Sequence, residues 1–262
     1  MRYGVISDIH GNLEALEAAI AVLSAEGVDH YLCAGDLVGY GPKPNECVAR
    51  VVELQAQCVA GNHDLMAVGA LSDERCSQLA RETMRWTRRV LTADSREYLG
   101  RLPLVLAPES EAVVAHGSLE DPSEYVRTNH QRAAQLRALA DGFPDARILI
   151  LGHTHERAAH GSVQGTLRTR LRRSLALADG ERYVLNPGSV GQSRDLMARS
   201  RFMLLDLARG LVRFYSARYD IRACRQALQS QGLPLSSVHT KPPLRQVGAD
   251  WIRGGIRKAT RT

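Results

Sequence analysis

The sequence predicts an α/β fold in which two β-sheets form a sandwich flanked by helices. In the first half of the chain, short apolar runs alternate with amphipathic helical patterns, which is typical of βαβ units and a largely parallel sheet. From about residue 162 onward, apolar residues recur at every second position, which is typical of antiparallel strands. With 262 residues the chain can bury a substantial core, and we expect one domain over residues 1–240 followed by a basic tail over 241–262.

Each element follows from its local pattern. The apolar runs of the first half are expected to be strands, at residues 2–7, 30–35, 57–61, 112–116 and 146–151. Helical patterns separate them, at residues 13–27, 44–55, 72–102 and 131–142. In the second half we expect strands at 182–189, 202–207 and 211–217, with a hairpin turn at 208–210, and a helix at 223–232.

Composition excludes several classes of protein. No run of about 18 apolar residues occurs, so no transmembrane helix is expected, and the N-terminus lacks a signal-peptide core. We therefore expect a cytoplasmic protein with no membrane partner. The five cysteines are odd in number and show no CxxC spacing, which argues against a disulfide framework or a thiolate metal site. Oligomeric state is left open.

The net charge of +6 is unevenly placed. The last 22 residues carry six Lys or Arg and one Asp, and a second basic cluster, LRTRLRR, occupies residues 167–173. Either could contact a phosphate-rich partner such as a nucleic acid. No repeated interleaving of aromatic residues accompanies these charges, so a solvated tail and a solvated hairpin face are the simpler interpretation.

Polar groups follow the apolar runs at five places. Each of five loops brings Asp, Asn or His, as DIH at residues 8–10, GD at 35–36, GNHD at 61–64, H at 116 and GHTH at 152–155. Loops at the carboxyl ends of strands are where α/β folds build their sites. Imidazole with carboxylate and no thiolate favours Mn²⁺, Fe or Zn²⁺ over Ca²⁺. His153 and His155, one residue apart, could each face a different metal of a pair.

This ordered set resembles the calcineurin-like metallophosphoesterases, whose pattern is D-x-H, G-D, G-N-H-[DE], H and G-H-x-H. The NPGS at residues 186–189 extends the likeness to about residue 195. The resemblance implies two divalent metal ions, with Mn first and Fe, Zn, Ni or Mg as alternatives. It implies that Asp36 bridges them and assigns the other ligands: Asp8, His10 and His155 for one ion, and Asn62, His116 and His153 for the other.

The resemblance also implies the chemistry, in which a metal-bound hydroxide attacks a phosphoester in line. His63 would protonate the leaving oxygen or stabilise the phosphoryl charge. Asp64 would orient or charge His63, with a plain helix cap as its alternative role. Tyr40, Tyr125 and Arg194 are candidate contacts for the substrate, with packing or surface positions as their alternatives.

The resemblance implies a phosphoester substrate, with a nucleotide among the candidates. The Ser/Thr protein phosphatases of this superfamily read GDxVDRG and GNHE, whereas this chain reads GDLVGYG and GNHD and lacks that arginine. The closer likeness is to small bacterial and archaeal phosphodiesterase-like members. We therefore expect a phosphodiesterase, with a phosphomonoesterase or nucleotide or protein phosphatase as alternatives. A non-catalytic interaction scaffold is the alternative of another class, although His63 and all seven ligand positions are present.

Overall fold

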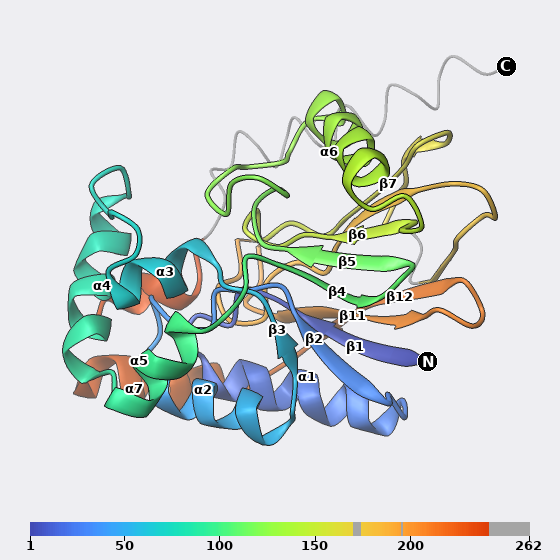
Figure 1. Cartoon of the computed structure of the whole chain (residues 1–262). Helices are drawn as coiled ribbons and strands as arrows, with labels where there is room; N and C mark the ends of the chain where they lie inside the picture. The colour runs from blue at the N-terminus through green and yellow to red at the C-terminus, as the bar shows by residue number, and fades with distance from the viewer. Residues whose placement is uncertain (170–173, 195, 241–262) are drawn as a thin grey trace, which may run out of the picture.

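A computed structural model describes residues 1–169, 174–194 and 196–240 of the chain. The predicted tail over 241–262 and residues 170–173 of the basic cluster lie outside the described residues. Within the described ranges the chain forms two six-stranded sheets, which confirms the predicted two-sheet sandwich (Figure 1).

The first sheet joins parallel and antiparallel strands. Its order is β3 (Gln57–Cys58), β2 (His30–Cys33), β1 (Arg2–Ile6), β11 (Ser200–Asp206), β12 (Leu211–Ala217) and β9 (Ser174–Ala176). The first three strands are parallel, and the last three are antiparallel to their neighbours. The β11–β12 hairpin turns at Gly210, which has φ 54°, so the predicted turn at 208–210 is confirmed.

The second sheet has the order β4 (Val105–Glu109), β5 (Ala112–Ala115), β6 (Ile148–Ile150), β10 (Tyr183–Asn186), β7 (Ala158–Gly161) and β8 (Gly165–Thr166). Strands β5, β6 and β10 run parallel, so the carboxyl ends of these three strands meet at one edge. The sequence predicts an antiparallel β10, and this is only half right. Strand β10 is antiparallel to β7 but parallel to β6, because the chain reverses direction after β6 to form β7 and has reversed again when it enters β10.

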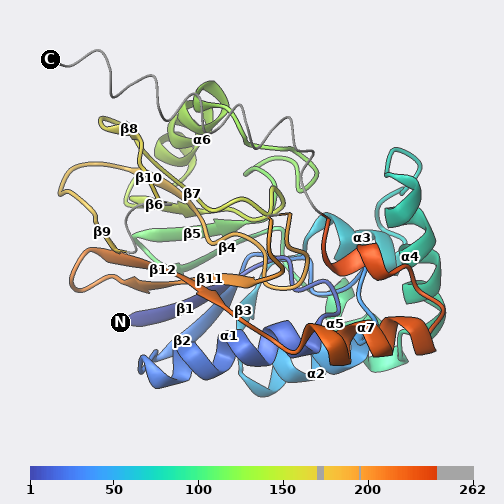
Figure 2. The ribbon, with the colours of Figure 1, turned by 180° about the vertical axis from the view of Figure 1, so that it is seen from behind.

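Helices cover both outer faces of the sandwich (Figures 1 and 2). Helices α1 (Leu13–Ala25), α2 (Pro44–Glu53) and α7 (Ile221–Ser230) lie on the side of the first sheet, and α6 (Asn129–Gly142) covers the second. Strand β11 shows why alternation builds this core: Phe202 and Leu204 face the helices, whereas Met203 and Leu205 pack between the sheets. No helix in the described ranges has both the length and the apolar character needed to cross a bilayer.

Two predicted elements differ from the observed ones. The strand predicted at 57–61 stops at Cys58, and α3 (Asn62–Val68) begins four residues later. The helical stretch predicted at 72–102 is two helices, α4 (Gln78–Val90) and α5 (Ala93–Gly100). The side chains of Ser77 and Thr92 accept hydrogen bonds from the first turns of α4 and α5, and these caps set both starts.

Candidate metal centre

All five predicted loops meet at one end of the sandwich. Asp8 and His10 follow β1, Asp36 follows β2, and α3 begins with Asn62. His116 follows β5, and the His153–His155 pair follows β6. Parallel strands end at the same edge of their sheets, and packing the two sheets brings both edges together. The structure therefore places all seven predicted metal ligands in one cluster.

The backbone of this cluster is held in the left-handed region. Seven non-glycine residues of the described ranges have positive φ, and six of them are predicted site residues: Asp8 (53°), His10 (49°), Asp36 (57°), Tyr40 (61°), His153 (61°) and His155 (59°). Each such residue costs about 1–2 kcal/mol. Hydrogen bonds between the loops offset this strain, including Asp8 N–H to the Gly35 carbonyl at 2.9 Å and His10 N–H to the Asp36 carbonyl at 2.9 Å. Strain collected in this way is typical of functional sites.

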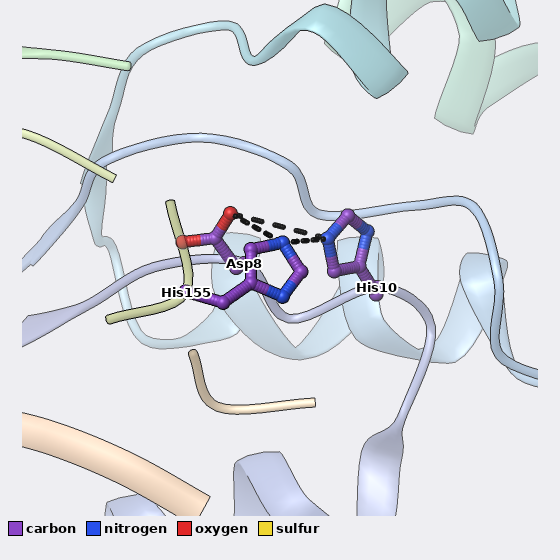
Figure 3. A group of neighbouring side chains, drawn as sticks. All are labelled: Asp8, His10 and His155. Atoms are coloured by element: carbon purple, nitrogen blue, oxygen red, sulfur yellow. Dashed lines mark hydrogen bonds and ion pairs between the residues drawn. The ribbon is translucent and has the colours of Figure 1, made fainter. Parts of the chain in front are cut away.

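One group of side chains comprises Asp8, His10 and His155 (Figure 3). The Nε2 atoms of the two histidines lie 3.2 Å apart, and His155 Nε2 lies 3.2 Å from Asp8 Oδ1. His10 Nε2 is 3.9 Å from the same carboxylate oxygen. Two imidazole nitrogens and a carboxylate oxygen thus face one another across a space that is buried from solvent.

A second group comprises Asp36, His116 and His153, with Asn62 beside it. His116 Nε2 lies 3.2 Å from Asp36 Oδ2 and 3.2 Å from Asn62 Oδ1. The Nε2 atom of His153 lies 3.0 Å from the carbonyl oxygen of Ser123, which leaves Nδ1 as its free nitrogen.

Asp36 belongs to the second group and also lies beside His10 of the first. Its Oδ1 accepts a hydrogen bond from His63 N–H at 2.7 Å, so Oδ2 is the oxygen left for ligands. That Oδ2 lies 3.6 Å from His10 Nε2 on one side and 3.2 Å from His116 Nε2 on the other. A Cβ at Gly61 would stand 2.1 Å from Asp36 Oδ1, so only glycine lets the start of α3 approach this carboxylate.

Three histidines present the same ring nitrogen to the site. The Nδ1 atoms of His10, His116 and His155 lie 3.1, 2.6 and 2.8 Å from the carbonyl oxygens of Val38, Ala34 and Gln192. A ring that donates Nδ1–H to a carbonyl keeps Nε2 as a lone pair, which is the usual arrangement behind a metal-binding histidine. The donor set of imidazole nitrogens, carboxylate oxygens and one amide oxygen therefore fits divalent transition metals.

The charges of the site are consistent with this fit. Burial opposes ionisation of both carboxyl groups. The charge of His116 outweighs burial at Asp36, and that of His155 outweighs it at Asp8, so the pKa of each carboxyl lies below its usual value. Within the described ranges, every ion pair of these carboxylates is with a histidine. Burial lowers the pKa of His63 to about 4 and that of His153 to about 3, so both rings are neutral at pH 7. Burial opposes protonation of His116, but the Asp36 carboxylate outweighs burial and raises the pKa of His116 to about 9, so a cation bound at this ring would displace a proton.

His63 lies against the first group without being held by it. Its ring centroid is 4.9 Å from that of His10 and 4.6 Å from that of Tyr40, and the residue is 5% exposed. Its Nδ1 is buried and has no hydrogen-bond partner within the described ranges. A buried ring nitrogen without a partner is rare, which marks His63 as a candidate functional residue beside the metal ligands.

The Asp64 carboxylate accepts hydrogen bonds from backbone N–H groups. Its Oδ2 accepts Gly61 N–H at 3.0 Å, which caps α3, and its Oδ1 accepts the N–H groups of Leu37 and Val38 at 2.9 and 3.2 Å. Burial, and then the charge of Asp36, raise the pKa of Asp64 to about 7. The expected contact between Asp64 and the His63 ring is absent from these bonds, and the carboxylate instead ties the Asp36 loop to the start of α3.

The three predicted substrate contacts surround the cluster. Tyr40 is 7% exposed and packs edge-on against His10. Tyr125 is 41% exposed, and its ring centroid lies 3.9 Å from that of His153. The Nη2 atom of Arg194 lies 3.4 Å from His155 Nε2.

Sequence reasoning missed the groups that hold these side chains in place. Ser7 donates to Asp8 Oδ2 at 2.7 Å, and Gln192 supplies the carbonyl that faces His155. The Gly-rich segment at 186–191 is the signal that could have located Gln192, because a Cβ at Gly191 would stand 1.7 Å from the Ile9 carbonyl oxygen. That segment is therefore packed directly against the β1 loop.

Comparison with known proteins agrees with this geometry. The calcineurin-like phosphoesterase superfamily domain matches residues 1–210. The chain belongs to this superfamily. A crystal structure of a metallophosphoesterase from Sphaerobacter thermophilus is 35% identical, with a TM-score of 0.74, over 91% of this chain and 96% of that one. This superfamily member is thus expected to be a hydrolase of the metallophosphoesterase class.

More distant relatives share the same framework. A hypothetical protein from Pyrococcus horikoshii OT3, at 20% identity, has a TM-score of 0.74 over 90% of this chain and 96% of its own, which shows the fold alone. An uncharacterised protein of Methanocaldococcus jannaschii is 29% identical over 235 residues, which cover 88% of this chain and 93% of the relative. These likenesses extend beyond residue 210, so the superfamily fold includes most of the described chain.

Proposed function

We propose that this superfamily member is a dinuclear metal-dependent phosphodiesterase. The observation that carries the proposal is the position of Asp36 Oδ2 between two groups of nitrogen and oxygen donors, 3.6 Å from His10 Nε2 and 3.2 Å from His116 Nε2. One carboxylate oxygen placed between two ligand sets is what a pair of adjacent cations needs.

The chain's own residues divide into two ligand sets. Asp8, His10, Asp36 and His155 would hold one ion, and Asp36, Asn62, His116 and His153 would hold the other. Mn²⁺ is the first candidate for both, because the set mixes imidazole and oxygen donors without thiolate. Two divalent ions bound there would lower the pKa of water and offset the charge on phosphoryl oxygens.

His63 and the three outer residues would act on the substrate. The unpaired Nδ1 of His63 makes it the candidate to hold or donate a proton at the leaving oxygen. Arg194, close to His155, would contact a non-bridging phosphoryl oxygen through its guanidinium. Tyr40 and Tyr125 lie on His10 and His153 respectively and would border the ester groups.

Two arguments disfavour a protein phosphatase and a non-catalytic scaffold. The chain lacks the arginine of the protein-phosphatase motif, having Gly39 and Tyr40 in that stretch. His63 and all seven ligand positions are filled, which disfavours a non-catalytic scaffold. A phosphomonoesterase with the same metal centre remains the second candidate, because the ligand set does not depend on the number of ester bonds. A nucleotide is one substrate with the right chemistry.

The test compares a chromogenic phosphodiester with the matching monoester. The purified protein is stripped with chelator and reloaded separately with Mn²⁺, Zn²⁺ or Mg²⁺. The proposal expects metal-restored cleavage, with the diester preferred. Preferential cleavage of the monoester would overturn the diesterase assignment and keep the metal chemistry. If the protein binds two ions per chain and cleaves neither the diester nor the monoester, the result would favour the non-catalytic scaffold.

A further inference from the structure

Gln192 lies at the junction of the metal centre, Arg194 and the C-terminal segment Leu235–Thr240. It is 2% exposed, and every hydrogen-bonding group it carries has a partner. Its backbone N–H donates to Ser189 Oγ at 2.9 Å, and its carbonyl oxygen lies 2.8 Å from His155 Nδ1. A buried amide with all its bonds made is rigid, which suits it to position other groups.

The side-chain amide of Gln192 makes two further bonds. Its Oε1 accepts a hydrogen bond from Arg194 Nε at 3.2 Å, and its Nε2 donates to the Ser237 carbonyl at 3.0 Å. The orientation of the amide follows from this network, because Arg194 can only donate and the carbonyl can only accept. One side chain thus connects the guanidinium at the site to a segment 45 residues further along the chain.

The segment Leu235–Thr240, which Gln192 contacts, is held in place by its own packing and backbone hydrogen bonds. Val238 of the short 3₁₀ helix Leu235–Val238 packs in a cluster with Trp86 of α4 and Leu228 of α7. Directly after it, Thr240 N–H donates to the Ser193 carbonyl at 3.0 Å, and His239 pairs with Ser193 as a parallel β-bridge. The loop that carries Arg194 is therefore connected through this segment to α4 and α7.

We propose that Gln192 is the positioning residue that aims Arg194 at the substrate phosphate, with Leu235–Thr240 as its anchor. An arginine side chain has several rotatable bonds, so an unrestrained guanidinium loses part of its binding energy to ordering. Fixing Nε on Gln192 leaves the terminal nitrogens for the phosphate, and Nη2 already lies 3.4 Å from His155 Nε2. This inference rests on the proposed function, since it assumes a phosphoryl group at the metal centre.

The test is a double-mutant cycle on the full chain loaded with Mn²⁺, using inorganic phosphate as the probe and calorimetry as the readout. Losing a charged contact to phosphate through Arg194→Ala should weaken binding by about 10- to 100-fold. Gln192→Met removes both amide groups at similar volume and should weaken binding by about 5- to 30-fold. Because Gln192 acts through Arg194, the double variant should bind phosphate no more weakly than Arg194→Ala alone.

Several results would overturn the inference. If Gln192→Met leaves phosphate affinity unchanged, or if the two losses multiply in the double variant, Gln192 does not act through Arg194. If Arg194→Ala leaves the affinity unchanged, there is no phosphate contact for Gln192 to position. Metal content measured for each variant confirms that two ions remain. If the protein shows this coupling in phosphate binding but cleaves no phosphoester, the proposed function is contradicted and the positioning role of Gln192 is not.

Asn45→Ala is a matched control, because the Asn45 amide also joins two segments, through the Val90 carbonyl at 2.8 Å and Thr92 N–H at 3.0 Å. It should lower Tm without changing phosphate affinity.

Gln192→Glu tests the contact between Gln192 and the segment Leu235–Thr240. Glutamate has nearly the same shape as glutamine, so this variant also serves if Gln192→Met does not fold. Its carboxylate cannot donate to the Ser237 carbonyl, so hydrogen exchange over residues 235–240 should become faster. Unchanged exchange there would refute the anchoring.

Discussion

Gly39 lies against the ring of His63, and Gly39→Ala would push that ring out of place. A Cβ at Gly39 would stand 2.4 Å from His63 Nδ1, whereas real Cβ contacts do not fall below 3.0 Å, so the ring must move by at least about 0.6 Å. A misplacement approaching 1 Å at a reacting group can cost about 10²-fold in rate. We therefore expect kcat to fall by about 10- to 100-fold.

Gly69 offers a control with the same backbone and no neighbour. Its φ is 83° against 86° at Gly39, and a Cβ there meets nothing within 4 Å. Both substitutions should cost about 1–2 kcal/mol of stability, because both place alanine in the left-handed region. Only the first should affect His63. Each variant is loaded with metal, its ions are counted, and Tm and the kcat for a chromogenic diester are measured.

The comparison can refute the reasoning in two ways. Wild-type kcat in metal-loaded Gly39→Ala would mean that the position of His63 does not limit turnover. An equal fall in kcat for Gly69→Ala would mean that general destabilisation, and not the contact with His63, controls the rate.

Three further predictions concern the same centre. His63→Ala should keep both ions while kcat falls by about 10²- to 10⁴-fold, and full turnover in that metal-loaded variant would remove its role as a proton donor. Asp36→Asn should weaken both ions together in a metal titration, and loss of one ion alone would contradict the shared carboxylate oxygen. Asp64→Asn should destabilise the protein by about 1–3 kcal/mol in urea unfolding, because an amide N–H₂ would face backbone N–H donors. Its kcat should fall less than that of His63→Ala, and an equal fall would restore a chemical role for Asp64.

Much of the framework could be predicted because its patterns are local. The alternation in β11 specifies which residues face the helices and which face the second sheet, and the caps at Ser77 and Thr92 are visible in the sequence. Helix α3 was missed because its seven residues are too short to show periodicity. Asp64 at its third position and Gly69 after its end, in the left-handed region, were the available signals.

The gathering of the metal ligands could be predicted, whereas the contacts that hold them could not. Strand-end loops rich in His and Asp meet at one edge for topological reasons, so spacing alone places Asp8 near His155. The carbonyl groups of Ala34, Val38 and Gln192 that orient the rings belong to no motif, because any residue type supplies a backbone oxygen. The bonds of Asp64 to the N–H groups of Leu37 and Val38 depend on how two loops approach each other in space, whereas its bond to Gly61 N–H is the helix cap that the sequence offers as its alternative role.

The most direct test of the central claim is a count of bound metal. The chelator-stripped protein is titrated with Mn²⁺ at equilibrium, and the bound ions per chain are measured for the wild type and for Asp36→Asn. The account predicts two ions per wild-type chain and a joint loss of affinity for both in the variant, because Asp36 Oδ2 lies between the two ligand groups. A wild-type chain that binds one ion or none, or a variant that keeps one ion at full affinity, would contradict it.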